Sequence, residues 1–182
     1  MKNIFSIFKL LSSERIILED FDPKESDLDG IYINTPGLDP VIGINKNIID
    51  SSRLYISTLG EELGHHFTTY GNLITTSKTY NDVLMKDKQE QKAKVWASNF
   101  LISDRDFVHA LNDCIISKDE MAEYFHVTEE IVNLKIKSII VDEEKYINIK
   151  RDFMTKEIQY NSCLIYVHII HIYLHNQYIM YI

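Results

Sequence analysis

The stretch TLGEELGHHFT, residues 58–68, decides how the rest of the chain is interpreted. It has the outline of HExxH, a helical motif in which two histidines one turn apart bind zinc in peptidases. Glu61 stands where that motif has its first histidine, and His65 stands at the second. Ligands at positions i and i+4 share one face of a helix, and a carboxylate oxygen also binds zinc. The pattern is therefore compatible with a metal site that has a changed ligand.

The register of the motif decides which residues can act. If Glu61 and His65 bind the metal, Glu62 follows the first ligand, where a glutamate acts as general base toward the attacking water. If Glu62 and His66 bind it, Leu63 takes that position and no hydrolysis follows. Only the first register describes an enzyme, and its carboxylate ligand should make the metal a weaker Lewis acid. The alternative is a solvated acidic helix face with both histidines near the surface.

A third ligand must come from elsewhere, because a catalytic zinc site needs three protein ligands. Residues 89–102 read as a helix, on which Glu90 lies on the same side as Ala93 and Ala97. A carboxylate aligned with small inward residues either points at a metal or extends from the end of a core face. The pattern alone leaves both interpretations open.

Composition excludes some classes of protein. The chain has 182 residues and a formal charge of −8, with 27 acidic against 19 basic residues, which disfavours a surface that coats nucleic acid. Its two cysteines, Cys114 and Cys163, form no CxxC motif, and we expect a reducing compartment. Lys9 interrupts the apolar N-terminal run and no cleavage site follows, so that run predicts a short amphipathic helix. We therefore expect a cytoplasmic protein.

Turn signals and hydrophobic periodicity place the other elements. Residues 1–21 read as one or two helices. Residues 30–34 and 41–45 alternate like strands around a proline-rich turn, which predicts a β-hairpin, and strand 41–45 is a candidate edge strand for aligning a bound peptide. Caps and apolar spacing predict further helices over residues 53–70, 79–101, 121–125 and 129–140. Ser103 starts another helix, and Ser117 with Glu120 forms a capping box before residue 121.

Two glycines lie four residues apart in the motif helix. Gly60 and Gly64 each cost about 1 kcal/mol relative to alanine in a helix interior. Two such costs on one face predict that another backbone approaches the helix closely there.

The helix pair expected over residues 117–140 has the spacing of a DNA-binding helix–turn–helix. Its second helix carries Lys135 and Lys137 but begins with Glu129 and Glu130, which disfavours binding in a DNA groove. We expect a helical pair packed on the core instead.

The tail from residue 163 to the end is apolar and long enough to approach a membrane span. His168, His171 and His175 argue against a span, and we expect a buried hairpin or a poorly ordered end rather than a metal cluster.

Five motifs follow one another along the chain: GIYI from residue 30, INK from residue 44, EELGHHFTTYG from residue 61, ExxAxxWA from residue 90 and MAEYFxV from residue 121. This ordered set resembles the ImmA/IrrE family of metallopeptidases. The resemblance covers about residues 10–140. It implies an α+β fold, in which a small zincin-like domain with a short antiparallel sheet and an active-site helix precedes a helical region.

Carried over to this chain, the resemblance implies that Glu61, His65 and Glu90 are the metal ligands, that Glu62 is the general base and that zinc is the cofactor. Family members occur in prophages and other mobile elements and are similar in cleaving a helix–turn–helix repressor. The chain would then be a cytoplasmic endopeptidase with a protein substrate and without direct binding to nucleic acid or membrane. The alternative is a weak or inactive homologue that binds a repressor without cutting it.

The resemblance also implies a division of the chain. We expect a zincin-like domain over residues 1–102, a helix–turn–helix-like region over residues 103–150 and a divergent apolar tail over residues 151–182.

Overall fold

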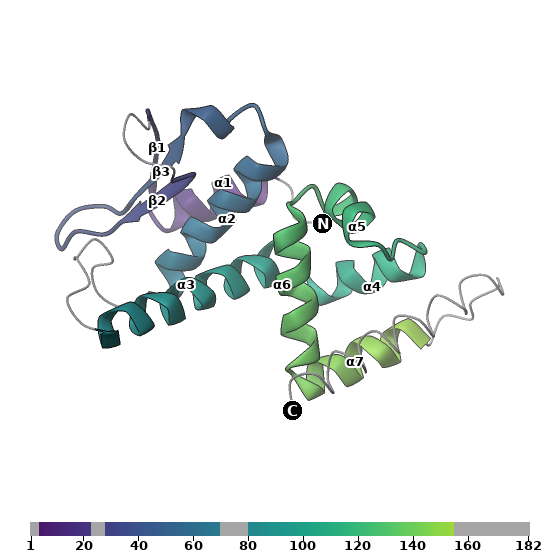
Figure 1. Ribbon diagram of the computed structural model, residues 1–182. Coiled ribbons are helices and arrows are strands. Elements are labelled where there is room, and N and C mark those ends of the chain that lie inside the picture. The colour runs from purple at the N-terminus through teal and green to yellow at the C-terminus, as the bar shows by residue number, and fades with distance from the viewer. Residues whose placement is uncertain (1–3, 23–27, 70–79, 155–182) are drawn as a thin grey trace.

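A small sheet and a set of helices make up the protein (Figure 1), whose computed structural model describes residues 4–22, 28–69 and 80–154. The elements are, in chain order, α1 (Ile4–Ser13), β1 (Ile17–Phe21), β2 (Gly30–Ile33), β3 (Val41–Asn45), the 3-10 turn η1 (Lys46–Ile48), α2 (Ser52–Thr68), α3 (Tyr80–Leu101), α4 (Asp104–Asn112), α5 (Lys118–Phe125), α6 (Glu129–Ile140) and α7 (Glu143–Met154). The sheet lies near the N-terminus and the C-terminal region is helical. The α+β class predicted from the sequence is confirmed.

The sheet has the strand order β1-β3-β2. β2 and β3 form the predicted antiparallel hairpin, in which Gly30 pairs with Ile44, and β1 adds a parallel partner, in which Ile17 pairs with Val41. β3 is therefore the central strand, and the expectation that residues 41–45 form an edge strand is wrong. Ile42 and Ile44 are fully buried, as is typical of a strand with neighbours on both sides. β2 is the edge strand next to α2.

The first 21 residues are not helical throughout. α1 ends at Ser13, Arg15 adopts a left-handed φ of 56°, and β1 then follows. The residues of β1, ILEDF, lack clean alternation of apolar and polar side chains, and pairing with β3 outweighs this weak local preference.

The motif helix α2 packs closely against α3, as its glycines predict. A Cβ atom built on Gly64 would lie 2.3 Å from the carbonyl oxygen of Ala93, and one built on Gly60 would lie 2.7 Å from Leu101 Cδ1. The two helix backbones can therefore approach only because position 64 has no side chain. This contact determines which residues of α3 face α2.

Helices α5 and α6 begin at the predicted residues, although Thr128 makes no side-chain cap of its own. The Ser117 hydroxyl accepts a hydrogen bond from the Glu120 amide and the Glu120 carboxylate accepts one from the Ser117 amide, both at 3.3 Å, which completes the capping box of α5. α6 starts after Thr128, whose backbone N–H donates to the Ser57 hydroxyl of α2 at 2.9 Å. The helical pair therefore packs on the core rather than standing apart from it.

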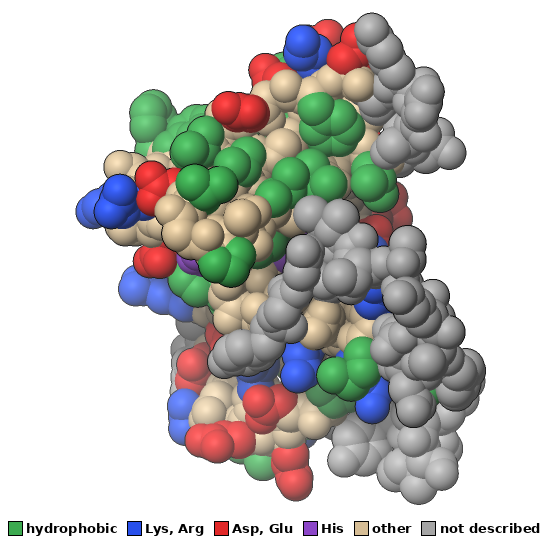
Figure 2. Space-filling view, turned by 90° about the vertical axis from the view of Figure 1, so that its left-hand side faces the viewer, with side chains coloured by type: hydrophobic (Ala, Val, Ile, Leu, Met, Phe, Trp, Pro, Cys, Tyr) green, Lys and Arg blue, Asp and Glu red, His purple; other side chains and the backbone are tan. Residues whose placement is uncertain are grey.

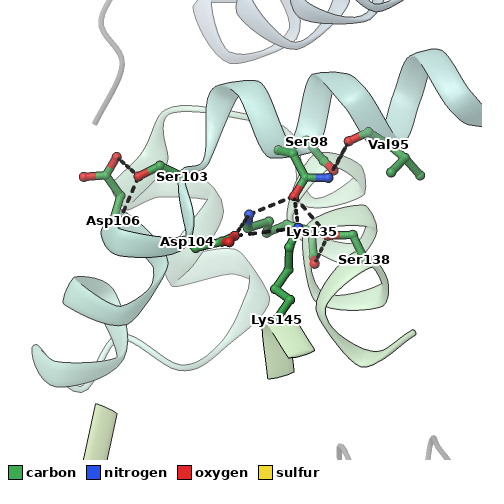
Figure 3. Close-up of polar contacts among 9 residues, drawn as sticks. Val95, Ser98, Ser103, Asp104, Asp106, Lys135, Ser138 and Lys145 are labelled. Carbon is green, nitrogen blue, oxygen red and sulfur yellow. Dashed lines mark hydrogen bonds and ion pairs between the residues drawn. The ribbon is translucent and has the colours of Figure 1, made fainter. Parts of the chain in front are cut away.

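A polar network around the buried Lys135 connects four helices (Figure 3). Lys135 of α6 is fully buried and donates to Asp104 of α4 and, at 2.9 Å, to Asn99 Oδ1 of α3. Lys145 of α7 donates to the same Asn99 oxygen at 2.9 Å, and the Ser138 hydroxyl does so at 3.2 Å. The side chain of Lys135 is thus unavailable to DNA, because its ammonium group holds α6 against α3 and α4.

Helix α7 was not expected, because residues 143–154 are rich in charged side chains. Ile149 and Phe153 are nevertheless buried, and Tyr146 packs against the same core. This apolar stripe at helical spacing is short, and its neighbours mask it in a sequence window.

On one face of the molecule, hydrophobic and charged side chains gather in different parts. Figure 2 shows hydrophobic side chains gathered on the upper part of this face and charged side chains crowding the lower part.

Within the described ranges, no helix has both the length and the apolar character that crossing a bilayer requires. Cys163, the tail histidines and the segment 70–79 lie outside the described residues, and the expected division into three regions stays a prediction.

Candidate metal centre

Two helices bring the three predicted ligands together. Glu61 and His65 come from α2 and Glu90 comes from α3, and one ligand atom of each lies within 4.8 Å of the other two. His65 Nε2 lies 3.1 Å from Glu90 Oε2. The close approach at Gly64 and Ala93 explains this meeting, because Glu90 lies almost one turn before Ala93 on the same face of α3. The assignment of the three residues as ligands stays a prediction.

The His65 ring is buried, and its Nδ1 atom, the ring nitrogen that does not face Glu90, has a partner of its own. Its Nδ1 atom lies 3.2 Å from the Thr69 hydroxyl at the end of α2. When Nδ1 donates to that hydroxyl, Nε2 keeps its lone pair on the side of Glu90. A partner of this kind fixes the orientation and tautomer of a metal-binding histidine. Thr69 was not predicted, although its position four residues after His65 offered a signal.

Glu62 lies close to this cluster and against the edge strand. Only 8% of its surface is exposed, and a Cβ atom on Gly30 of β2 would lie 2.7 Å from its Oε1 atom. Burial raises the pKa of Glu62 to about 8, and the charges of Glu61 and Glu90 add to the effect. A cation at the cluster would lower this pKa and free the carboxylate to accept a proton.

The two carboxyl groups of the cluster differ in their affinity for protons. Burial raises the pKa of Glu61, and a hydrogen bond with Glu90 adds to the effect. The hydrogen bond from His65 holds the pKa of Glu90 well below its usual range. Without a metal, the cluster therefore binds protons that an incoming cation has to displace.

Lys94 is a member of the site that sequence reasoning missed. Its ammonium nitrogen lies 3.5 Å from Glu61 Oε1, 3.7 Å from Glu90 Oε1 and 3.2 Å from Glu130 Oε1 of α6. Burial alone would lower the pKa of Lys94, but the three carboxylates raise it above its ordinary value. The only signal in the sequence was its position four residues after Glu90.

His66 has partners away from the cluster. Its Nδ1 atom lies 2.9 Å from the Tyr32 hydroxyl, and its Nε2 atom lies 3.5 Å from Glu14 Oε2. Sequence reasoning gave His66 no role in hydrolysis, and the structure places it between α2, β2 and the turn that follows α1.

A cleft of about 560 Å³ opens onto the cluster. It is lined by strand β2, including Gly30 and Tyr32, and by residues of α2, α3 and α6. A second cleft of about 680 Å³ runs between α3 and α6 and shares Glu90, Lys94 and Glu130 with the first. The edge strand, the cluster and the gap between the two helices thus form neighbouring parts of one surface.

The donor atoms fit a divalent cation. One imidazole nitrogen and two carboxylate oxygens on two helices can hold an ion while leaving a position open, which is the arrangement of a catalytic site. Imidazole suits zinc and iron, whereas carboxylates suit manganese and magnesium, so this mixed set does not select zinc by itself.

Comparison with known families identifies a match to most of the chain. Residues 13–137 match the family model described as the IrrE N-terminal-like domain, Peptidase_M78. This segment contains the whole sheet, α2, α3 and the candidate cluster. No curated protein and no solved structure matches the chain significantly.

Proposed function

Because the chain belongs to the ImmA/IrrE family of metallopeptidases, we propose that it is a metal-dependent endopeptidase that cuts a regulatory protein of the helix–turn–helix repressor class. The observation that carries this proposal is the meeting of Glu61, His65 and Glu90 beside a buried Glu62. Zinc is the first candidate for the metal.

The residues of the cluster have separate roles in this proposal. Glu61, His65 and Glu90 would hold a divalent ion, which when bound supplies a Lewis acid that polarises the scissile carbonyl and acidifies the attacking water. The Glu62 carboxylate takes a proton from that water and then gives it to the leaving amine. Thr69 keeps the His65 ring oriented throughout.

Strand β2 is the element that fits the alignment of a peptide. It is an edge strand, it lines the cleft, and its outer backbone groups can pair with an extended chain. Gly30 leaves room for the Glu62 carboxyl at the point where that chain would pass. This role belongs to β2 rather than to β3, whose two sides are already paired.

The alternative function is binding of a repressor without cleavage. Lys94 favours it, because an ammonium group within 3.7 Å of both cluster carboxylates weakens their attraction for a metal cation. Metal content and cleavage together distinguish the two functions.

The first test compares Glu62→Gln and His65→Ala with the wild type. We expect the wild type to retain a divalent metal after purification and to cleave members of a fluorescence-quenched peptide library. Glu62→Gln should keep the metal and lose about 100- to 10,000-fold in kcat/KM, which is the usual contribution of a general base. His65→Ala should lose the metal, as measured by elemental analysis.

Two outcomes would contradict this proposal. Full cleavage by Glu62→Gln would remove the general base, and equal metal content in the wild type and in His65→Ala would remove the metal centre. A wild type that holds metal but cleaves neither peptides nor repressors would support the binding function instead.

A further inference from the structure

The candidate centre has more negative charge than the histidine form of its motif. In HExxH with a glutamate as third ligand, two carboxylates, one ligand and one base, balance a divalent ion. Here Glu61 and Glu90 supply two ligand carboxylates, and Glu62 supplies a third carboxylate that lines the same cleft. With a divalent ion bound, the group carries one excess negative charge unless a further cation lies close to it.

Lys94 is positioned to supply that cation. Its ammonium group contacts Oε1 of Glu61 and Oε1 of Glu90, whereas the other oxygen of Glu90, Oε2, faces His65. The lysine therefore lies on the side of Glu90 away from the imidazole, where it can stay while His65 and Oε2 hold an ion. Its side chain is only 26% exposed, so its charge is less screened by water than that of a surface lysine.

A third carboxylate fixes the lysine in place. Glu130 accepts a hydrogen bond from Lys94 at 3.2 Å and comes from the first turn of α6. Its side chain is 64% exposed, so water screens its charge and it offsets that of Lys94 only in part. Because Lys135 holds α6 against α3, Glu130 stays within reach of the ammonium group. The position of Lys94 is thus determined by contacts from α2, α3 and α6.

We propose that Lys94 is a positioning residue that compensates the charge of the carboxylate at position 61. The proposal rests on the proposed function of Glu61, His65 and Glu90 as a metal centre. Lys94 draws charge from the ligand carboxylates, which weakens their hold on the ion and makes the ion a stronger Lewis acid.

The test is Lys94→Met with two matched controls. Lys94→Arg keeps the charge, and Lys92→Met removes the same charge from an exposed position on the same helix. Zinc affinity is measured by competition with a chromophoric chelator at about pH 8.5, where protons compete least with the metal for the ligands.

We expect Lys94→Met to bind zinc about tenfold more tightly, because a repelling charge has been removed, and to cleave peptides at least tenfold more slowly. Lys94→Arg should keep both values within about threefold, and Lys92→Met should change neither. A side chain that only supports the fold would lower affinity and activity together. Weaker zinc binding by Lys94→Met, or unchanged binding, would therefore overturn the proposal.

The variant Glu61→His supplies a second measurement. With histidine at position 61 the centre is balanced without a lysine, so adding Lys94→Met to Glu61→His should lower peptide cleavage by less than about threefold, compared with at least tenfold in the wild-type background. A loss of activity equal to that in the wild type would contradict charge compensation. Failure of the metal centre itself has a different signature, because the wild type and His65→Ala would then bind equally little zinc.

Discussion

At the scale of single residues, the buried carboxyl of Glu62 makes stability depend on pH. Its pKa is raised from an ordinary 4.5 to about 8 in the folded protein, chiefly by burial. Between these values the folded protein holds a proton that the unfolded chain has released, so the free energy of unfolding falls as the pH rises.

We therefore expect metal-free protein, prepared with a chelator, to lose stability between about pH 5 and pH 8, by up to about 1.4 kcal/mol per pH unit from this group. The measurement is the urea midpoint at a series of pH values. Glu62→Gln cannot titrate and should show a flatter dependence. Equal slopes for the two proteins would mean that Glu62 is ionised in the folded state at neutral pH.

The sequence allowed part of this site to be predicted. The spacing of Glu61, Glu62 and His65 follows from helix geometry alone, and only one register leaves a glutamate in the position of a base. Glu90 was left open between two interpretations, because its direction depends on how α3 crosses α2. Lys94 was missed for a similar reason, since its contacts with Glu61 and Glu130 become apparent only after the helices are in place. The position of Thr69, four residues after His65, already offered a signal.

At the scale of elements, we expect the two glycines at the contact between α2 and α3 to differ in how well each position accepts a side chain. Gly64→Ala would bring a Cβ atom to 2.3 Å from the backbone oxygen of Ala93, whereas Gly60→Ala would meet the movable end of Leu101 at 2.7 Å. We expect Gly64→Ala to cost about 1–3 kcal/mol of stability, even after the gain in helix propensity. Gly60→Ala should cost less than about 1 kcal/mol.

The same two variants test whether the packing of α2 against α3 determines zinc affinity. Because Glu90 lies almost one turn before Ala93, pushing α3 away should weaken zinc binding at least tenfold in Gly64→Ala and little in Gly60→Ala. Urea denaturation and chelator competition measure the two effects. Tight zinc binding in a destabilised Gly64→Ala protein would show that α3 can move without moving Glu90.

The elements themselves were predictable where local signals are strong. The hairpin, the capping box of α5, the start of α6 after Thr128 and the two long helices follow from turn residues, capping patterns and apolar spacing. β1 was missed because its pairing with β3 is made across the chain, and α7 was missed because its apolar stripe is short and lies among charged residues. In both cases, tertiary contacts decide the conformation that local preference leaves open.

At the scale of the whole molecule, the buried Lys135 should make the helical region unfold together with α3. Asp104 is about half exposed, whereas only 1% of the Lys135 side chain is exposed, so removing each partner has a different cost. Asp104→Ala leaves a buried ammonium group with less compensation and should cost about 3 kcal/mol. Lys135→Met leaves a carboxylate that water can reach and should cost less than half of that.

Chemical denaturation followed by both tryptophan fluorescence and circular dichroism measures these costs and shows whether one transition remains. Trp96 on α3 reports on the region near the site, and circular dichroism reports on all helices. A larger cost for Lys135→Met than for Asp104→Ala would mean that Lys135 contributes mainly by packing its alkyl chain.

The hydrogen bond at the start of α6 restricts which substitutions relatives of this chain can accept. Thr128 makes no side-chain cap of its own, and its backbone N–H is bound by the hydroxyl of Ser57, 71 positions earlier. A relative that lost the hydroxyl at position 57 would leave this partly buried amide unpaired unless a glutamate or glutamine at position 131, the third residue of α6, accepted its hydrogen bond as in a capping box. The two positions are therefore expected to covary among relatives. Changes at the start of α6 would then accompany changes in the motif helix α2 during evolution.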